Sequence, residues 1–231
     1  KPTQHSVKEL RSLGIGPDVL VCRSEQELPN EEKDKIALFC SVPNDNVISM
    51  HDVDTVYSIP ILLNKQKVDE IILNKLKVKT KKPNLNDWKR VVKAKLHPAK
   101  EVNVSFVGKY TELKDSYKSI NEALEHAGIQ NKAKVNIDFV EAEEITAKNV
   151  KRILKNSDAI LVPGGFGERG IEGMITACKH ARENDIPYLG ICLGMQVAII
   201  EYARNVLKLK SANSTEFDLE TNFPVIGLIT E

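Results

Sequence analysis

The stretch Gly190-Ile191-Cys192-Leu193-Gly194 places a thiol between two glycines. An apolar run at 186–189 precedes it, and a pattern typical of a helix follows from 195 to 207. We expect a strand, a sharp turn and a helix, with glycine on both sides because the turn is strained and larger side chains would crowd a substrate. The helix N-terminus also favours negative charge. The pattern therefore predicts covalent catalysis at Cys192.

A cysteine nucleophile usually works with an imidazole base. The last histidine of the sequence is His180, which precedes the cysteine. Proximity in sequence does not identify the partner base of Cys192, so the elbow alone leaves the purpose of the thiol open.

The composition limits the function classes. The sequence has 231 residues and a formal net charge of +1, enough for one large or two small domains and too little charge for a strongly electrostatic nucleic-acid binder. It has neither an apolar run of about 18 residues nor the apolar core of a signal peptide, so we expect no membrane span. Its four cysteines show no C-x-x-C spacing. We expect free thiols in a reducing, cytoplasmic protein.

Charge is concentrated between residues 65 and 100, where lysine and arginine greatly outnumber acidic residues. Within this segment, residues 77–84 have no apolar periodicity and end in a turn signal. We expect a basic linker at 76–100 that separates two domains, 1–75 and 101–231.

Beyond the linker the pattern alternates regularly. Strands are predicted at 102–107, 135–140, 159–162 and 186–189, and helices at 116–127, 147–154, 171–183 and 195–207. Gly128 is interpreted as the stop of the first of these helices. Alternating strands and helices predict a doubly wound parallel α/β sheet whose ligands lie at the carboxyl ends of the strands.

A second glycine-rich segment, residues 163–170, directly follows the predicted strand at 159–162. Its glycines allow backbone N–H groups to face an anion or a developing oxyanion. The segment lacks the Lys-Ser/Thr ending of a P-loop and the spacing of a dinucleotide site. Beside a thiol elbow, it favours an oxyanion hole.

Three stretches, Pro163–Gly167, Gly190–Gln196 and Ala212–Phe217, occur in an order that resembles the class I glutamine amidotransferase domain of the CTP synthase family. The first half agrees: Lys1–Arg11, Pro17–Ser24 and Lys35–Cys40 resemble the end of the synthetase domain in that family. The resemblance implies an incomplete amidotransferase-like sheet, preceded by the C-terminal part of an α/β synthetase domain of P-loop type.

The same resemblance implies a ligase of pyrimidine biosynthesis. Glutamine would be hydrolysed at the cysteine, and its ammonia would aminate UTP to CTP with ATP and Mg²⁺. The implied partners are glutamine, UTP or CTP, and ATP, with no nucleic acid and no membrane. The amidotransferase part would need no cofactor, and the family enzyme would be a cytoplasmic homotetramer.

Residue roles follow only from the resemblance. Cys192 would be the nucleophile, and the N–H groups of Gly164 and Leu193 would form the oxyanion hole. The glutamine pocket would comprise Gly165, Phe166, Leu193, Gly194, Met195, Gln196 and Glu216. Glu216 would hold the α-amino group of the substrate, since a carboxylate is a natural partner for an ammonium.

The first domain would bind nucleotides. The residues expected at the pyrimidine nucleotide are Lys1, Pro2, Thr3, Gln4 and Lys35, and those expected at ATP are Arg23, His51, Asp52 and Val53. Without the resemblance, the simpler interpretation is that Lys35 and Arg23 are ordinary surface residues and that His51 is a polar turn residue.

The chain also departs from the family pattern. In the family, a histidine and a glutamate downstream of the nucleophile complete the triad, and the P-loop and the magnesium ligands lie upstream of the position of Lys1. We therefore expect a fragment that is inactive in isolation and contains no metal site. The alternatives are another cysteine hydrolase of related fold, such as a γ-glutamyl hydrolase or a protease-like relative, and a non-catalytic binding module.

Overall fold

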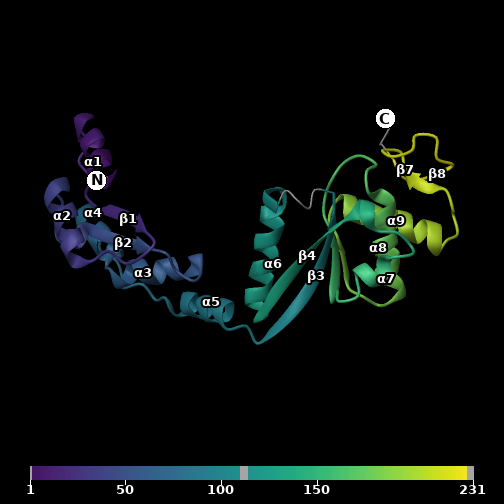
Figure 1. The fold of residues 1–231 in the computed structure, drawn as a ribbon, viewed down its shortest axis with the longest axis horizontal. Helices are drawn as coiled ribbons and strands as arrows, with labels where there is room; N and C mark the ends of the chain where they lie inside the picture. The colour runs from purple at the N-terminus through teal and green to yellow at the C-terminus, as the bar shows by residue number, and fades with distance from the viewer. Residues whose placement is uncertain (1, 110–113, 228–231) are drawn as a thin grey trace. The chain divides into compact units, whose positions relative to one another are not determined.

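A computed structural model describes residues 2–109 and 114–227. The chain divides into two compact units, 1–97 and 98–231 (Figure 1). The finer division into 1–75, 76–100 and 101–231 stays a prediction. Among the described residues, none of the helices combines the length and the apolar character needed to cross a membrane.

The first unit is built on two parallel strands, β1 (Leu20–Ser24) and β2 (Val47–His51). Its helices are α1 (Pro2–Ser12), α2 (Asn30–Cys40), α3 (Ile59–Lys65), α4 (Val68–Leu76) and α5 (Asn86–Leu96), with short 3₁₀ turns η1 (Asn44–Asn46) and η2 (Val56–Ser58). Its small core consists of Val7, Cys22, Ala37, Cys40, Val42 and Val47. Strands and helices alternate here as the α/β prediction requires.

Two polar contacts fix the periphery of this unit. Trp88 of α5 donates its indole N–H to the carbonyl of Tyr57 in η2, so α5 packs on the first unit although it lies within the expected linker. Gln66, just after α3, bonds with its carboxamide to both the N–H and the carbonyl of Ser49 in β2, at 2.9 Å each. The segment 78–85 between α4 and α5 has no regular structure.

The second unit contains a four-stranded parallel sheet in the order β4-β3-β5-β6. Its strands are β3 (Lys100–Gly108), β4 (Ala133–Glu141), β5 (Ala159–Val162) and β6 (Tyr188–Gly190). The helical elements are η3 (Lys114–Tyr117), α6 (Lys118–Gln130), η4 (Ala142–Glu144), α7 (Val150–Ile153), α8 (Ile171–Glu183) and α9 (Leu193–Asn205). The predicted parallel α/β sheet is confirmed.

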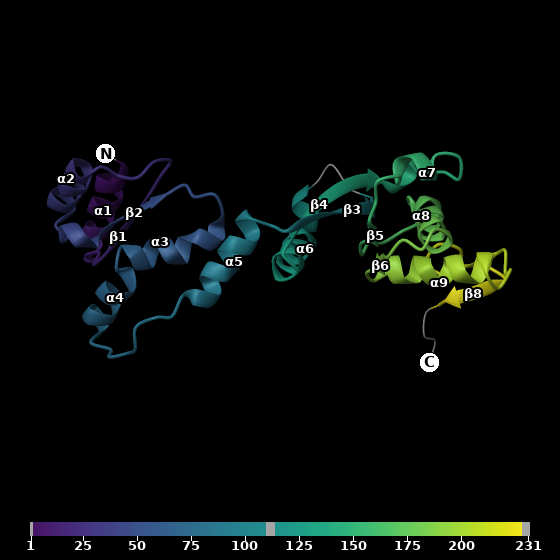
Figure 2. The ribbon, with the colours of Figure 1, turned by 90° about the horizontal axis from the view of Figure 1, so that it is seen from below.

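Helices cover both faces of this sheet, α6 on one and α8 and α9 on the other (Figure 1). Alternate strand residues serve the two layers: Phe106 and Leu161 pack toward α6, whereas Val107 and Val162 join the core formed with α8 and α9. After α9, a parallel pair of short strands, β7 (Ala212–Ser214) and β8 (Phe223–Ile226), lies beside that helix (Figure 2). The strand order reverses between β3 and β5, and the carboxyl ends of the strands at such a reversal are where ligands bind in sheets of this kind.

The interpretation of Gly128 as a helix stop is wrong, because α6 continues to Gln130. A Cβ on Gly128 would lie 2.6 Å from the carbonyl oxygen of Ala133 at the start of β4. Glycine is therefore needed at this position so that the helix can approach the strand closely.

Candidate functional site

The predicted elbow is present between β6 and α9. Cys192 is exposed and has φ 52° and ψ −102°, a backbone conformation that L-residues rarely adopt. Such strain costs about 1–3 kcal/mol and persists only where the surroundings enforce it. The turn therefore presents the thiol to solvent at the edge of the sheet where ligands of this fold bind.

The two flanking glycines serve a different purpose from the one expected. Neither has a positive φ, so the strain lies on the cysteine itself. A Cβ on Gly194 would overlap the carbonyl oxygen of Val162 in β5, and a Cβ on Gly190 would overlap the backbone of Gly194. Both glycines allow the first turn of α9 to lie directly against the strands, which fixes the height of Cys192 above the sheet.

The other three cysteines are buried, and all four are free, as predicted. Burial, helped by the nearby Glu201, raises the pKa of the Cys178 thiol to about 12. Such a thiol stays protonated and is out of reach. Cys192 is thus the accessible thiol of the chain.

The glycine-rich segment 163–170 follows β5 and lies against the elbow. A Cβ on Gly164 would be 3.6 Å from the Cβ of Cys192, and one on Gly165 would be 3.2 Å from the side chain of Leu193. Within the described part of the chain, the N–H groups of Gly164 and Leu193 have no hydrogen-bond acceptor. Two unpaired backbone donors beside a thiol are suited to an anionic oxygen.

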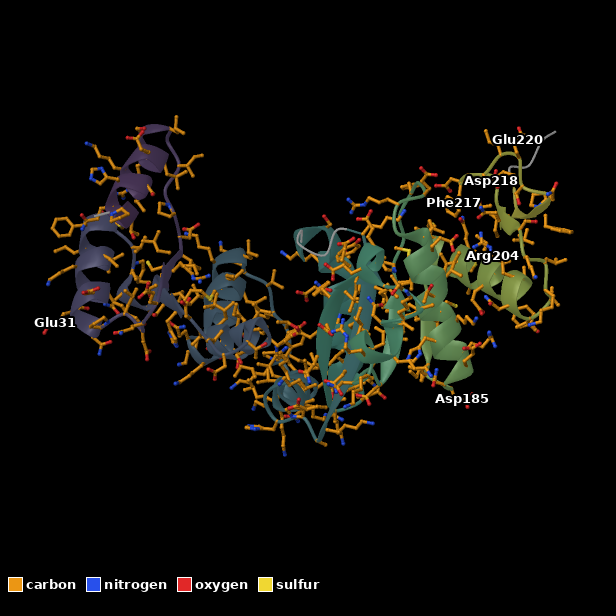
Figure 3. All side chains as sticks on the ribbon, turned by 45° about the vertical axis from the view of Figure 1, so that its right-hand side comes forward. Glu31, Asp185, Arg204, Phe217, Asp218 and Glu220 are labelled. Atoms are coloured by element: carbon orange, nitrogen blue, oxygen red, sulfur yellow. The ribbon has the colours of Figure 1, made fainter. Side chains whose placement is uncertain are left out.

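Glu216 comes to the same place from a turn after β7. The N–H groups of Phe217 and Asp218 both donate to the carbonyl of Ser214, and the N–H of Glu216 donates to the Ser214 hydroxyl. Figure 3 labels Phe217 and Asp218 of this turn. The carboxylate of Glu216 accepts the N–H of Gly167 at 2.9 Å. The structure therefore joins Glu216, distant in sequence, to the glycine-rich segment.

The turn that carries Glu216 is itself anchored on α9. Arg204, labelled in Figure 3, donates from Nε to the carbonyl of Ala212 in β7 at 2.6 Å. It also donates from Nη1 to the carboxylate of Glu172 in α8 at 2.8 Å. One side chain thus links β7, α8 and α9. This link fixes the position of Glu216 relative to the helix that begins at the elbow.

The remaining residues expected in the glutamine pocket have different exposures. Phe166 is 85% exposed and Met195 is 53% exposed, whereas Gly194 is buried. The Oε1 atom of Gln196, in the first turn of α9, is buried and has no hydrogen-bond partner in the part of the chain that the structure describes. Buried polar atoms normally have a hydrogen-bond partner, so this acceptor is an exception among the described residues.

Sequence patterns did not point to Lys109, which directly follows β3. This lysine is only 3% exposed, and its ammonium donates to the carbonyls of Phe166, at 2.9 Å, and of Gly167. Burial lowers the pKa of Lys109, and the negative charge of Glu216 opposes that effect. The available signal was its place at the end of a central strand, beside the reversal of strand order.

Lys109 is held in turn by Arg169. The guanidinium donates to the carbonyl of Lys109 and lies 3.7 Å from the carboxylate of Glu141 and 3.6 Å from that of Glu143. The carboxyl ends of β3 and β4 and the glycine-rich segment are therefore tied together by side-chain contacts.

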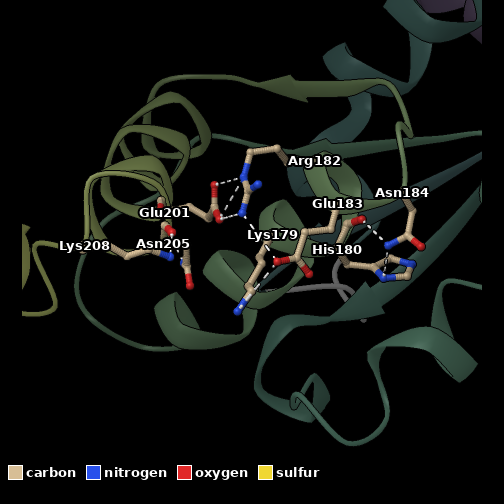
Figure 4. A network of polar contacts seen from close by, with 8 residues as sticks. All are labelled: Lys179, His180, Arg182, Glu183, Asn184, Glu201, Asn205 and Lys208. Atoms are coloured by element: carbon tan, nitrogen blue, oxygen red, sulfur yellow. Dashed lines mark hydrogen bonds and ion pairs between the residues drawn. The ribbon is translucent and has the colours of Figure 1, made fainter.

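Two polar contacts brace the helix behind the thiol. Glu201 of α9 is 1% exposed and receives three hydrogen bonds from the guanidinium of Arg182 in α8, at 2.8 to 3.2 Å (Figure 4). The Tyr188 hydroxyl of β6 donates to the carbonyl of Gly194 at 2.8 Å. The first turn of α9 is thus attached to the strand that precedes the elbow.

In the first unit, the four residues expected at ATP meet at the carboxyl ends of β1 and β2. Arg23 forms an ion pair with Asp52 at 2.7 Å, and Ser24 lies opposite His51 in the register. The Nδ1 atom of His51 is buried without a hydrogen-bond partner in the described residues, and Val53 follows two residues later. The four residues thus lie at one end of the two strands, and their role at ATP stays a prediction.

The residues expected at the pyrimidine nucleotide lie on α1 and α2. Pro2, Thr3 and Gln4 form the first turn of α1, which packs against α2, and Lys35 is exposed on α2. Lys1 lies outside the described residues. The described residues contain no group of three or more His, Cys, Asp or Glu side chains that could hold a metal ion.

The parallel sheet, the strained thiol elbow and the adjacent glycine-rich segment define the class of protein: a parallel α/β protein that presents a cysteine at a strand–helix turn. Comparison with protein families agrees: residues 112–222 match "Glutamine amidotransferase class-I", and residues 1–78 match "CTP synthase N-terminus". With these two matches in this order, the chain belongs to the CTP synthase family.

Among solved structures, the chain is similar to the glutaminase domain of Trypanosoma brucei CTPS with bound acivicin. The two are 42% identical with a TM-score of 0.53, and the match covers 55% of this chain and 50% of that one. The chain therefore spans about half the length of the structure it matches. The match at residues 1–78 separates this chain from a γ-glutamyl hydrolase, which shares only the elbow.

Proposed function

We propose that the second unit binds glutamine and that Cys192 attacks its side-chain amide, releasing ammonia for the amination of UTP to CTP. The single observation that carries this proposal is the exposed thiol in a strained backbone beside two unpaired N–H groups. The family to which the chain belongs supports the choice of glutamine.

Glutamine binding is assigned to groups around the elbow. The α-ammonium of glutamine pairs with the carboxylate of Glu216, which the Gly167 N–H already orients. Gln196 supplies its unpaired Oε1, and Phe166 and Met195 cover the aliphatic part of the substrate. The pocket thus recognises the amino acid end and leaves the amide end at the thiol.

In the chemical step, the sulfur of Cys192 forms a bond to the amide carbon. The amide oxygen of the substrate becomes an oxyanion that accepts hydrogen bonds from the N–H groups of Gly164 and Leu193. In comparable sites, each such donor stabilises the transition state by about 3 kcal/mol. The C–N bond then breaks, the nitrogen takes up a proton and leaves as ammonia, and water hydrolyses the thioester to glutamate. A downstream histidine with its glutamate, as the resemblance implies, would accept the thiol proton.

The first unit is assigned to the nucleotide half-reaction, in which ATP activates UTP for attack by ammonia. The ATP site is assigned to the carboxyl ends of β1 and β2, with Arg23, His51, Asp52 and Val53. The pyrimidine nucleotide is assigned to Lys35 and the start of α1. The homotetramer implied by the resemblance belongs to this proposal. Four free thiols favour a reducing compartment, the cytoplasm.

The test is covalent labelling by acivicin, followed by intact mass. We expect one adduct on Cys192, slowed at least about tenfold by saturating glutamine and absent in Cys192→Ser, with Cys178→Ser as the matched control that labels normally. Labelling that glutamine does not slow, or an adduct on another cysteine, would contradict the glutamine site.

The complete reaction is tested separately by incubating the protein with UTP, ATP and either glutamine or ammonia. Formation of CTP from ammonia but not from glutamine would show that only the synthetase half is complete. A protein that binds glutamine but carries out no amination with either nitrogen source under these conditions is the result expected if the isolated chain is inactive.

A further inference from the structure

The ammonium of Lys109 lies beneath the glycine-rich segment, away from solvent. Its two described acceptors are the carbonyls of Phe166 and Gly167, and its stem passes 4.0 Å from the position that a Cβ on Gly165 would occupy. A buried lysine loses hydration and side-chain entropy, and hydrogen bonds must offset both. Lys109 donates its hydrogen bonds to backbone carbonyls of one loop, the glycine-rich segment 163–170.

We propose that Lys109 is a positioning residue for amide hydrolysis: it holds the carbonyls of Phe166 and Gly167 so that the Gly164 N–H stays directed at the Cys192 elbow. The inference rests on the proposed function, because it assigns the loop to the oxyanion. In the part of the chain that the structure describes, no hydrogen bond or ion pair joins Lys109 to Cys192, Gly164 or Leu193.

The loop needs such a clamp because of its composition. Residues 163–170 include four glycines, each of which has more backbone freedom than any other residue. Gly167 and Gly170 have φ values of 73° and 74°, so the loop is folded back on itself rather than extended. The carbonyls of Phe166 and Gly167 both point to the ammonium of Lys109. Their orientation fixes the peptide planes that follow Gly164, the proposed oxyanion donor.

A second contact acts on the same residue of the loop. The Gly167 N–H donates to Glu216, while the Gly167 carbonyl accepts from Lys109. Both backbone polar groups of Gly167 are therefore held by side chains, one from the residue that follows β3 and one from the turn after β7. The same contacts join the oxyanion loop to the carboxylate proposed to hold the substrate.

The first experiment measures backbone hydrogen exchange by mass spectrometry. Lys109→Met keeps the apolar stem and removes the donor, and Lys134→Met on the neighbouring strand β4 is the matched control at an exposed lysine. We expect exchange in peptides covering 163–170 to be about tenfold faster in Lys109→Met, since bonds from a charged donor are lost, and unchanged in Lys134→Met. Peptides of β3 and α8 should exchange as in the parent.

The second experiment separates positioning from packing. It compares the rate at which Cys192 reacts with acivicin with the rate at which it reacts with iodoacetamide. Iodoacetamide requires an accessible thiol but does not have to bind in the glutamine site. In Lys109→Met the acivicin rate should fall about tenfold with the iodoacetamide rate nearly unchanged, and Lys109→Arg should restore part of the acivicin rate. A purely structural role would change both rates together.

Each outcome is decisive. Unchanged exchange at 163–170 overturns the clamp, and faster exchange with an unchanged ratio of the two labelling rates overturns its role in positioning. If the parent protein shows no preference for acivicin, the proposed function fails, and the exchange experiment alone still decides the clamp. Should Lys109→Met not fold, Lys109→Gln, whose shorter neutral amide cannot span both carbonyls, replaces it in both experiments.

Discussion

Cys192 carries the backbone strain of the elbow itself, whereas its neighbours Gly190 and Gly194 provide the close packing that enforces it. Sequence reasoning placed the glycines correctly but for the wrong reason. The distinction matters for engineering, because a residue replacing Cys192 must tolerate φ near 52°, whereas a residue replacing Gly194 must have no side chain.

The most deeply buried charge that α9 contributes to the core is Glu201, and its partner Arg182 determines whether the charge is tolerated. We predict that Arg182→Met lowers the free energy of unfolding by about 3 kcal/mol, because it leaves a buried carboxylate unpaired. Urea denaturation followed by circular dichroism measures the change.

The control for this prediction is the double variant Arg182→Met with Glu201→Met. Replacing both partners removes the stranded charge, so we expect stability within about 1 kcal/mol of the parent. A double variant as unstable as the single one would show that packing around the pair, and not charge burial, dominates.

At the residue scale, the Gly-Ile-Cys-Leu-Gly motif pointed to Cys192, whereas Gly164 and Glu216 followed only from the resemblance. In the structure Gly164 lies against Cys192 and Glu216 bonds to the same glycine-rich segment, while their roles stay predictions.

The sequence did not predict Lys109 or Tyr188, since each side chain bonds to a backbone carbonyl, that of Phe166 and that of Gly194. Every residue has a backbone carbonyl, so the sequence does not show which carbonyl will accept a hydrogen bond from a side chain. Such contacts can be identified only in the three-dimensional structure.

The approach of α6 to β4 depends on one residue of the helix. We predict that Gly128→Ala destabilises the protein by about 2 kcal/mol, since its Cβ would push against the backbone carbonyl of Ala133, which cannot move like a flexible side chain. Thermal unfolding of the second unit is the measurement.

Gly16→Ala is the matched control for this substitution. Gly16 has an ordinary φ and nothing within 4 Å of an added Cβ, so we expect a change within about 0.5 kcal/mol. If Gly128→Ala were equally neutral, the close contact between α6 and β4 would not exist as described.

The element boundaries show where local chemistry overrides periodicity. The predicted helix at 147–154 forms only from Val150 to Ile153, because the Asn149 side chain bonds to the N–H of Thr146 and to the carbonyl of Glu144. These bonds give the backbone an alternative to the helix. By contrast, the long apolar strands and α8 follow their patterns closely, because packing on both faces of the sheet reinforces them.

At the scale of the whole molecule, the chain has two independent cores, and the segment 78–85 lacks regular structure within the first unit. We predict that trypsin first cleaves after Lys77, Lys79 or Lys81, which are exposed, and spares Lys93 and Lys95, because α5 is a folded helix. Mass spectrometry of the first fragments identifies the sites.

Replacing Lys77, Lys79 and Lys81 by glutamine should slow this first cut without opening another of equal rate. Cleavage at Lys93 or Lys95 as early as at Lys79 would mean that the whole basic segment 76–100 is an open linker, as the sequence suggested, and that Trp88 does not hold α5 on the first unit.

The carboxamide of Gln66 has a consequence for how the first unit behaves in solution. By bonding to both backbone groups of Ser49, it occupies the outer edge of β2 as a further strand would. Exposed strand edges recruit other chains, and natural proteins cover them to prevent aggregation. Gln66 is thus a one-residue substitute for a neighbouring strand, and it guards the sheet against self-association at that point.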